Sequence, residues 1–382
     1  MAIPLRHLRP LLAAFLLALA APSGARASAS DPPPGRIAAV LERTLASYSD
    51  RAGGADPRYY ADGVWHTGNA ACWVCNIGPG VGAATLAAER PELVRVAVAT
   101  MGRALDRQLA SGAFAGAGGA ADAITTAWLV NDLGTVMLQL DGGLDGATRA
   151  RWSRSLADSV DYLLRTNQTT WYVNGNINLS YTEALWLAWR ITGADRYRSA
   201  YEASWSFTLN PPQGRWKGFG LRLTKRPART DGADGAGYLA EKGAGLPGFD
   251  AEYAQLQLDV LASFYALSHE PRALRLMNLL MNGVISRVSS RSVLDARNGS
   301  RHSLRTPFLT PALSTLVRHG RDDLAFRLDA QLEAIDQQYA GALTFTHPNF
   351  YRGVGSWLAT PLIEQDGTAR CAAAGAARRQ RS

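Results

Sequence analysis

Hydrophobic residues recur every three or four positions along most of the chain. Val94, Val98, Met101 and Leu105 form one such run, and further runs lie at 130–140, 152–163, 256–267, 274–284 and 324–335. This spacing places the apolar side chains on one face of a helix. No segment alternates apolar and polar residues for long enough to predict a strand. The pattern therefore predicts an all-α protein without a sheet.

The predicted helices come in pairs joined by short polar turns. Three segments, LWLAWRITGADRYRSAYEASW, LASFYALSHEPRALRLMNLL and LSTLVRHGRDDLAFRLDAQL, each predict a helix, a turn and a second helix. Between residues 35 and 340 the periodicity gives roughly ten helices, in about five to six antiparallel hairpins. The hairpins differ in length, which favours a closed toroid or incomplete barrel over an open solenoid.

Long connections interrupt the helices at 53–82, 166–178, 211–248 and 289–311. Loops of this length are uncommon in a compact domain unless they bind or cover something. We expect them to gather over one mouth of the toroid, where binding and catalytic residues are usually carried.

The first 27 residues predict a secretory signal peptide. They combine a basic start (Arg6, Arg9), an apolar run and the small-residue pattern Ala25-Arg26-Ala27. The apolar run is shorter than the roughly 20 residues of a membrane-spanning helix, so no stable membrane insertion is expected after cleavage. The mature protein is expected to be secreted or extracytoplasmic, in the periplasm or at a cell surface. Residues 28–365 predict a single toroid domain, and 366–382 a disordered tail rich in Ala, Arg and Gly.

Composition and cysteine usage narrow the function classes. With 47% hydrophobic and 19% charged residues the chain is neither disordered nor collagen-like. Removal of the signal peptide, which carries three Arg and no acid, lowers the net charge from +8 to +5. A mildly basic protein suits an anionic polymer, whereas export argues against nucleic acid as the partner. Cys72 and Cys75 form a CxxC pair that lacks the second pair needed for zinc, so a structural disulfide is expected outside the cell, with redox or metal chemistry as the alternative. The sequence leaves open whether these two cysteines pair with each other or one of them pairs with Cys371. No motif predicts a cofactor or a metal.

The second long connection carries amides and aromatic side chains directly before a helix. It holds Trp171, Tyr172, Asn174, Asn176 and Asn178. One amide, Asn176 or Asn178, is expected to cap the helix. The others can bind sugar hydroxyl groups or a substrate carboxylate, and Trp171 can stack on a pyranose ring.

The third connection is basic and leads into a helix start with carboxylates. Asp250, Glu252 and Tyr253 lie at this start, and Lys242 and Trp216 are candidate substrate-binding residues upstream. Helix capping by Asp250, with Glu252 near the positive helix end, is the structural explanation. A catalytic role is compatible with it, because charge chemistry is easily placed at a helix N-terminus.

Two histidines lie in other long connections. His66 follows Trp65 in the first, and His302 follows Arg301 in the fourth. Each is a candidate base or substrate ligand, since a histidine can exchange a proton near neutral pH. His269 and His319, beside hairpin turns, are expected to be structural.

With its helical hairpins, the Asn174-Gly175-Asn176 loop and the Tyr253 segment, the chain resembles the toroidal polysaccharide lyases, and the single-domain alginate lyases in length. The resemblance implies that Asn174 or Asn176 holds a uronate carboxylate. It also implies that Tyr253 removes the C5 proton and protonates the leaving oxygen. The family's histidine and arginine have no counterpart next to these motifs, so His66, His302 and Arg301 would have to supply them from other loops.

The sequence therefore predicts a secreted enzyme that cleaves a polysaccharide, with uronate as a candidate unit, by β-elimination. One alternative is an inverting glycoside hydrolase, which needs two carboxyl groups about 6.5–9.5 Å apart. Asp250 or Glu252 would then pair with Asp62, Asp231 or Glu183. A second alternative is a non-catalytic secreted glycan-binding protein. The sequence predicts no particular oligomeric state.

Overall fold

The computed structural model describes residues 77–87, 90–116, 118–167, 174–212, 214–242, 247–287 and 309–339. The predicted signal peptide and tail lie outside these ranges, and the domain limits and the disulfide stay predictions. Nine candidate residues also lie outside them: Asp62, Trp65, His66, Cys72, Cys75, Trp171, Tyr172, Arg301 and His302.

Ten α-helices make up most of the described chain. They are α2 (Gly78–Leu86), α3 (Leu93–Leu105), α4 (Ala123–Gln139), α5 (Gly146–Arg165), α6 (Gly175–Thr192), α7 (Asp195–Leu209), α8 (Ala251–Ser268), α9 (Pro271–Ile285), α10 (Thr310–Arg318) and α11 (Ala325–Tyr339). Each even-numbered helix packs against the odd-numbered helix that follows it.

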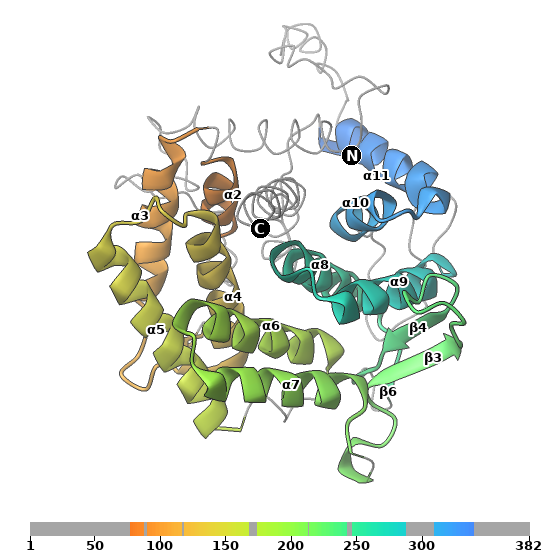
Figure 1. The fold of residues 1–382 in the computed structure, drawn as a ribbon, viewed down its shortest axis with the longest axis horizontal. Coiled ribbons are helices and arrows are strands. Elements are labelled where there is room, and N and C mark those ends of the chain that lie inside the picture. The colour runs from red at the N-terminus through yellow and green to blue at the C-terminus, as the bar shows by residue number, and fades with distance from the viewer. Residues whose placement is uncertain are drawn as a thin grey trace, which may run out of the picture.

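The hairpins are arranged in an arc of two layers. The helices α2, α4, α6, α8 and α10 pack on one another in this order and form the inner layer, while the odd-numbered helices lie outside (Figure 1). This arrangement confirms the predicted all-α toroid or incomplete barrel of helical hairpins.

The helix boundaries follow local signals in the sequence. Asp122, Asp145 and Asp250 each accept a hydrogen bond from a backbone N–H of the first turn of α4, α5 and α8. These carboxylates satisfy donors that the helix itself leaves unpaired. Gly193 ends α6 in the left-handed conformation, and Pro271 opens α9.

The prediction that the chain forms no sheet is wrong. Among the described residues, three two-stranded antiparallel sheets occur: β1 (Phe114–Ala115) with β2 (Ala121–Asp122), β3 (Leu221–Lys225) with β4 (Ala236–Leu239), and β5 (Glu241–Lys242) with β6 (Pro247–Gly248). The strands are short, and four of the five residues of β3 are exposed, so no apolar alternation marks them in the sequence.

The third long connection is therefore structured, and its turn is fastened to α9. The Asn278 amide donates to the Asp231 carbonyl at 3.0 Å, and the Asn282 amide donates to the carbonyls of Ala233 and Gly235 at 2.9 and 2.6 Å. The first connection is shorter than predicted, because α2 already begins at Gly78.

Aromatic side chains fill the core between the two layers. Phe264 of α8 lies edge-on against Trp186 of α6 at 5.3 Å and near Trp205 of α7 at 6.1 Å. Trp186 and Trp205 are buried, as expected for core residues, and Trp128 and Trp189 pack on the core partly buried. Among the helices of the described ranges, none is long and apolar enough to cross a bilayer.

Candidate functional site

A buried carboxyl group joins the starts of two inner helices. Glu241 of β5 is 1% exposed. Its Oε1 atom accepts the backbone N–H of Asn176, in the first turn of α6, at 3.0 Å. The same atom accepts the side-chain amide of Gln257, in α8, at 2.6 Å. The two motifs that the sequence offered, the asparagine loop and the segment around Tyr253, are thus joined through a third residue.

The surroundings of Glu241 favour its protonated form. Burial, the largest cause, together with the nearby charge of Asp250, raises the pKa of Glu241 to about 8 against the opposing effect of its hydrogen bonds. At neutral pH the group therefore keeps its proton. Its second oxygen, Oε2, is buried and meets no hydrogen-bond partner in the part of the chain that the structure describes.

Asp250 supplies a second buried carboxyl group beside Glu241. Its Oδ1 atom accepts the backbone N–H of Tyr253 at 3.0 Å, which confirms that it caps α8. Tyr253 is half-buried in the first turn of the same helix. Glu252 precedes it, but its side chain lies outside the described part.

The predicted capping of α6 by an asparagine side chain is wrong. The N-cap residue is Asn174, whose side chain makes no capping bond, and Asn176 and Asn178 lie inside the first turn, buried. Glu241 takes the capping role from a distant segment, because its carboxyl oxygen meets the N–H of Asn176. The Asn176 side-chain oxygen is left without a partner among the described residues.

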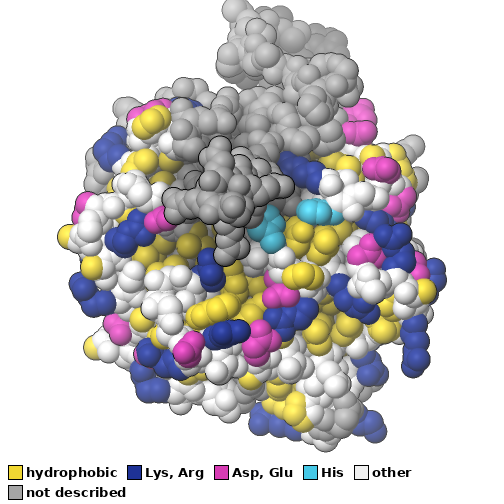
Figure 2. Space-filling view, viewed as in Figure 1, with side chains coloured by type: hydrophobic (Ala, Val, Ile, Leu, Met, Phe, Trp, Pro, Cys, Tyr) yellow, Lys and Arg dark blue, Asp and Glu magenta, His cyan; other side chains and the backbone are white. Residues whose placement is uncertain are grey.

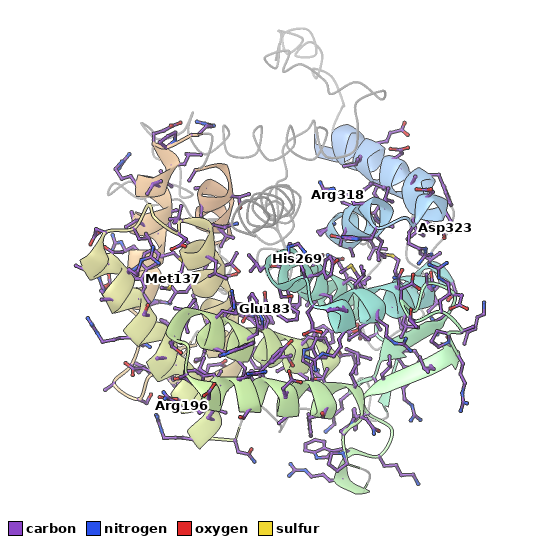
Figure 3. All side chains as sticks on the ribbon, viewed as in Figure 1. Met137, Glu183, Arg196, His269, Arg318 and Asp323 are labelled. Atoms are coloured by element: carbon purple, nitrogen blue, oxygen red, sulfur yellow. The ribbon has the colours of Figure 1, made fainter. Side chains whose placement is uncertain are left out.

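One face of α6 is turned to the centre of the arc. Ser180 accepts a hydrogen bond from Asn131 of α4 on one side, and Trp186 packs on α8 on the other. Glu183 lies between these two directions, and Figure 3 shows it on the central side of α6. Asn176 shares its face, because residues seven positions apart nearly coincide around a helix.

A buried polar stripe also follows α8. Gln255, Asp259 and Ser263 are four residues apart, so they share one helix face, and all three are buried. At about 100° per residue, Gln255 lies opposite Phe264, on the side of α8 away from the aromatic core. Asp and Glu are rarely buried, so Glu183 and Asp259 mark the inner helices as functionally interesting.

Sequence reasoning missed Glu241 and Asp259 as site residues. A signal for Asp259 was present, since it is a single carboxylate within the apolar helical run LQLDVLASF. Glu241 carried no such signal, because it lies in a two-residue strand within a segment rich in glycine and alanine.

The structure does not gather every candidate at this site. Trp216, in the short helix η3 (Gly214–Trp216), packs against Phe207 of the outer helix α7 at 5.5 Å. Lys242 is exposed on β5. Asp231 is bound to Arg229 at 2.6 Å, and this guanidinium, with the backbone N–H of Ala233, lowers the pKa of Asp231 to about 2.

The two histidines of the described residues, His269 and His319, lie at the C-terminal ends of α8 and α10. Figure 2 shows two histidine side chains close together on the face in view. His269 ends α8 with a φ of 51°, and the ring of Tyr265 lies edge-on to His269 at 5.8 Å and to His319 at 5.0 Å. Their place at helix ends fits the structural role expected for them. In the described ranges no group of three or more His, Cys, Asp and Glu side chains is placed to hold a metal ion.

The fold is similar to those of solved carbohydrate enzymes. D-mannose isomerase superposes with a TM-score of 0.53 at 12% identity, covering 87% of this chain and 99% of its own. A point mutant of unsaturated glucuronyl hydrolase from Streptococcus agalactiae superposes with a TM-score of 0.51 at 10% identity, covering 87% and 91%. No family model matches the sequence, and no curated protein is significantly similar to it. These similarities support the toroid part of the predicted resemblance and not its alginate-lyase part.

Proposed function

We propose that this protein is a carbohydrate-active enzyme that hydrolyses a glycosidic bond, with Glu241 as the proton donor and Asp250 as the base. The observation that carries the proposal is the pair of buried carboxyl groups where α6 and α8 begin. One member, Glu241, has a pKa raised to about 8.

Glu241 meets one requirement of hydrolysis, and Asp250 is the carboxyl group that acts on its pKa. A glycosidic oxygen leaves readily only when it is protonated, so the acid must hold its proton at the working pH. Glu241 meets this demand, and its two bonds through Oε1 fix the group while Oε2 is left to carry the proton. The second carboxylate activates water in an inverting enzyme. One structural neighbour is itself named a glucuronyl hydrolase, which is consistent with this choice.

The substrate in this proposal is a polysaccharide or oligosaccharide outside the cytoplasm. The predicted signal peptide supports the location. The net charge after its removal, 40 − 3 − 32 = +5, supports an acidic glycan over a neutral one. Nucleic acid is not proposed as a partner.

A second candidate reaction is β-elimination on a uronate, the mechanism that the sequence resemblance implies. It is favoured by Tyr253, which follows the buried Asp250 at the start of α8. Elimination also needs a positive group or amide to neutralise the developing enolate charge. Asn176 is the candidate amide, since Glu241 links the first turn of α6, where Asn176 lies, to α8.

Both reactions can be tested with one set of variants. The purified chain is incubated with acidic and neutral polysaccharides, and new reducing ends and the ultraviolet absorbance of unsaturated uronates are followed together. Glu241→Gln and Asp250→Asn should each lower hydrolysis by about 10²-fold or more, because general acid and base catalysis contribute on this scale. Glu92→Gln, an exposed carboxylate paired with Arg90 at 3.0 Å, is the matched control and should keep full activity.

The outcomes separate the three functions. Reducing ends without absorbance, lost in Glu241→Gln and Asp250→Asn, support hydrolysis. Absorbance that disappears in Tyr253→Phe moves the assignment to elimination. Binding without cleavage across the panel identifies a non-catalytic glycan-binding protein.

A further inference from the structure

An arginine at the end of α9 lies over two aromatic rings. The guanidinium carbon of Arg287 is 4.3 Å from the ring centre of Phe249 and 5.7 Å from that of Tyr238. The two rings meet edge to face at 5.9 Å. All three side chains are half-buried, so the cluster reaches the surface.

The backbone fixes the position of this arginine. Nη1 of Arg287 donates to the carbonyl of Gly283 and, at 3.4 Å, to the hydroxyl of Ser286. A Cβ atom on Gly283 would overlap the carbonyl of Gly237 in β4, so helix and strand approach more closely than any larger residue permits. This contact holds the end of α9 beside Tyr238, the next residue of β4.

Arg287 differs from Arg229, Arg272 and Arg321 in its partners. Arg229, Arg272 and Arg321 each bind a carboxylate, at 2.6, 2.9 and 2.7 Å. No carboxylate of the described chain pairs with Arg287, and only its Nη1 donates within that part. A guanidinium whose orientation is fixed presents its remaining N–H groups as a fork, and this fork matches a carboxylate.

The cluster adjoins the proposed catalytic carboxyl groups. Phe249 directly precedes Asp250, and the neighbouring Gly248 of β6 pairs with Glu241 of β5. Figure 1 shows α9 and β4 side by side, in agreement with the packing of α9 on β4. Arg287 thus places a cation next to Phe249, just before the N-terminal end of α8, whereas the sequence has no arginine directly upstream of Tyr253.

We propose that Arg287, with Tyr238 and Phe249, is a specificity-determining receptor for the carboxylate of an acidic sugar unit bound beside Glu241 and Asp250. The inference rests on the proposed function and names the substrate class of that site. The guanidinium pairs with the sugar carboxylate, and the aromatic rings contact the apolar face of the same sugar. A sulfate ester offers similar chemistry, and the test separates the two.

The test measures binding with matched oligosaccharides. Short oligosaccharides of glucuronate, galacturonate and mannuronate are compared by calorimetry with the same compounds after reduction of each carboxyl group to a hydroxymethyl group. A sulfated neutral oligosaccharide forms a further arm. The proteins are the wild type, Arg287→Gln, Arg287→Lys and the control Arg226→Gln, which removes an exposed cation from the β3–β4 hairpin that carries Tyr238.

We expect the wild type to bind at least one uronate oligosaccharide about ten-fold more tightly than its reduced form, because charge-assisted bidentate bonds are stronger than neutral ones. Arg287→Gln should abolish this difference, Arg287→Lys should restore part of it, and Arg226→Gln should keep it. Thermal melting of each variant confirms folding. No preference for any uronate, an equal preference in Arg287→Gln, or a preference for the sulfated compound alone would overturn the inference.

This result is independent of catalysis. If uronate binding depends on Arg287 but no glycan is cleaved, the proposed hydrolase function is refuted and the proposed carboxylate receptor is supported. Cleavage of acidic glycans that Arg287→Gln leaves unchanged in rate and in Michaelis constant would refute the receptor and keep the hydrolase.

Discussion

The ionisation of Glu241 links stability to pH at the scale of a single residue. Its pKa rises from an ordinary 4.5 to about 8 in the folded chain. The folded state therefore keeps a proton that the unfolded state has lost between these values, so this group makes the free energy of unfolding fall as pH rises through that window. The same proton is the one the proposed reaction uses.

Comparison with Glu241→Gln tests this linkage. The amide cannot ionise, so the variant lacks this loss of stability. The unfolding temperature of Glu241→Gln should therefore rise relative to that of the wild type as pH is raised from 4.5 to about 8. Thermal denaturation across this range measures the difference. Parallel curves for the two proteins would show that Glu241 titrates normally in the folded chain.

Catalysis should respond to the same residue. Activity that depends on protonated Glu241 should decline as pH rises through about 8. In Glu92→Gln the decline of activity at alkaline pH should be the same as in the wild type. In Glu241→Gln the activity that shows this decline should be lost, as expected for a proton donor at this position. A rate that increases through that pH would contradict it.

At the scale of elements, the start of α6 depends on a glycine. A Cβ atom on Gly175 would lie 2.5 Å from Cβ of Leu239 and 3.1 Å from Nε2 of Gln257. Gly175→Ala should therefore push β4 and α8 away and cost about 1–3 kcal/mol of unfolding free energy, as overpacking does. Gly102→Ala is the control, because nothing lies within 4 Å of its added methyl group inside α3. Denaturant unfolding measures both variants. A free energy of unfolding for Gly175→Ala that is equal to or higher than that of Gly102→Ala would contradict the close packing.

The β3–β4 hairpin depends on a polar link to the α10–α11 pair. Arg321 donates to the side-chain oxygens of Asn278 and Asn282 at 2.7 and 2.9 Å, and the amide groups of these asparagines hold the hairpin turn. Arg321→Met should lower the unfolding free energy by about 1.5–3 kcal/mol, the range of bonds to a charged group.

Limited proteolysis gives a local readout of that link. Cleavage within 222–235 should be faster in Arg321→Met than in wild type, since the turn loses its support. Arg95→Met, an exposed change on α3, should leave the cleavage rate unchanged. Equal rates in all three proteins would show that α9 holds the hairpin without Arg321.

At the scale of the whole molecule, stability rests on the shared core of the two helix layers. Phe264 contacts side chains from α6 and α7, so Phe264→Ala should cost about 3–5 kcal/mol, the range for a large aromatic residue in a core. Phe326→Ala provides the matched control, because Phe326 is 57% exposed, and should change stability by less than about 0.5 kcal/mol. Denaturant unfolding compares them directly, and similar losses in both would contradict a core centred on Phe264.

The sequence by itself determined the helical hairpins and their caps. Apolar periodicity and the caps Asp145 and Asp250 are local signals, written within one or two turns of the chain. The class of fold followed, since amphipathic helices joined by short turns must bury their apolar faces against one another. The short strands escaped prediction because their pairing, rather than their own pattern, defines them.

Only the tertiary structure decided which polar groups meet. Glu241 reaches Asn176 and Gln257, and Arg287 reaches Phe249, across long stretches of sequence with no local pattern to link them. Burial then sets the chemistry, because the same carboxyl group that would ionise in water keeps its proton where α6 and α8 begin. The sequence alone thus specified the helical scaffold, while the contacts that could give it a reaction exist only once the chain is folded.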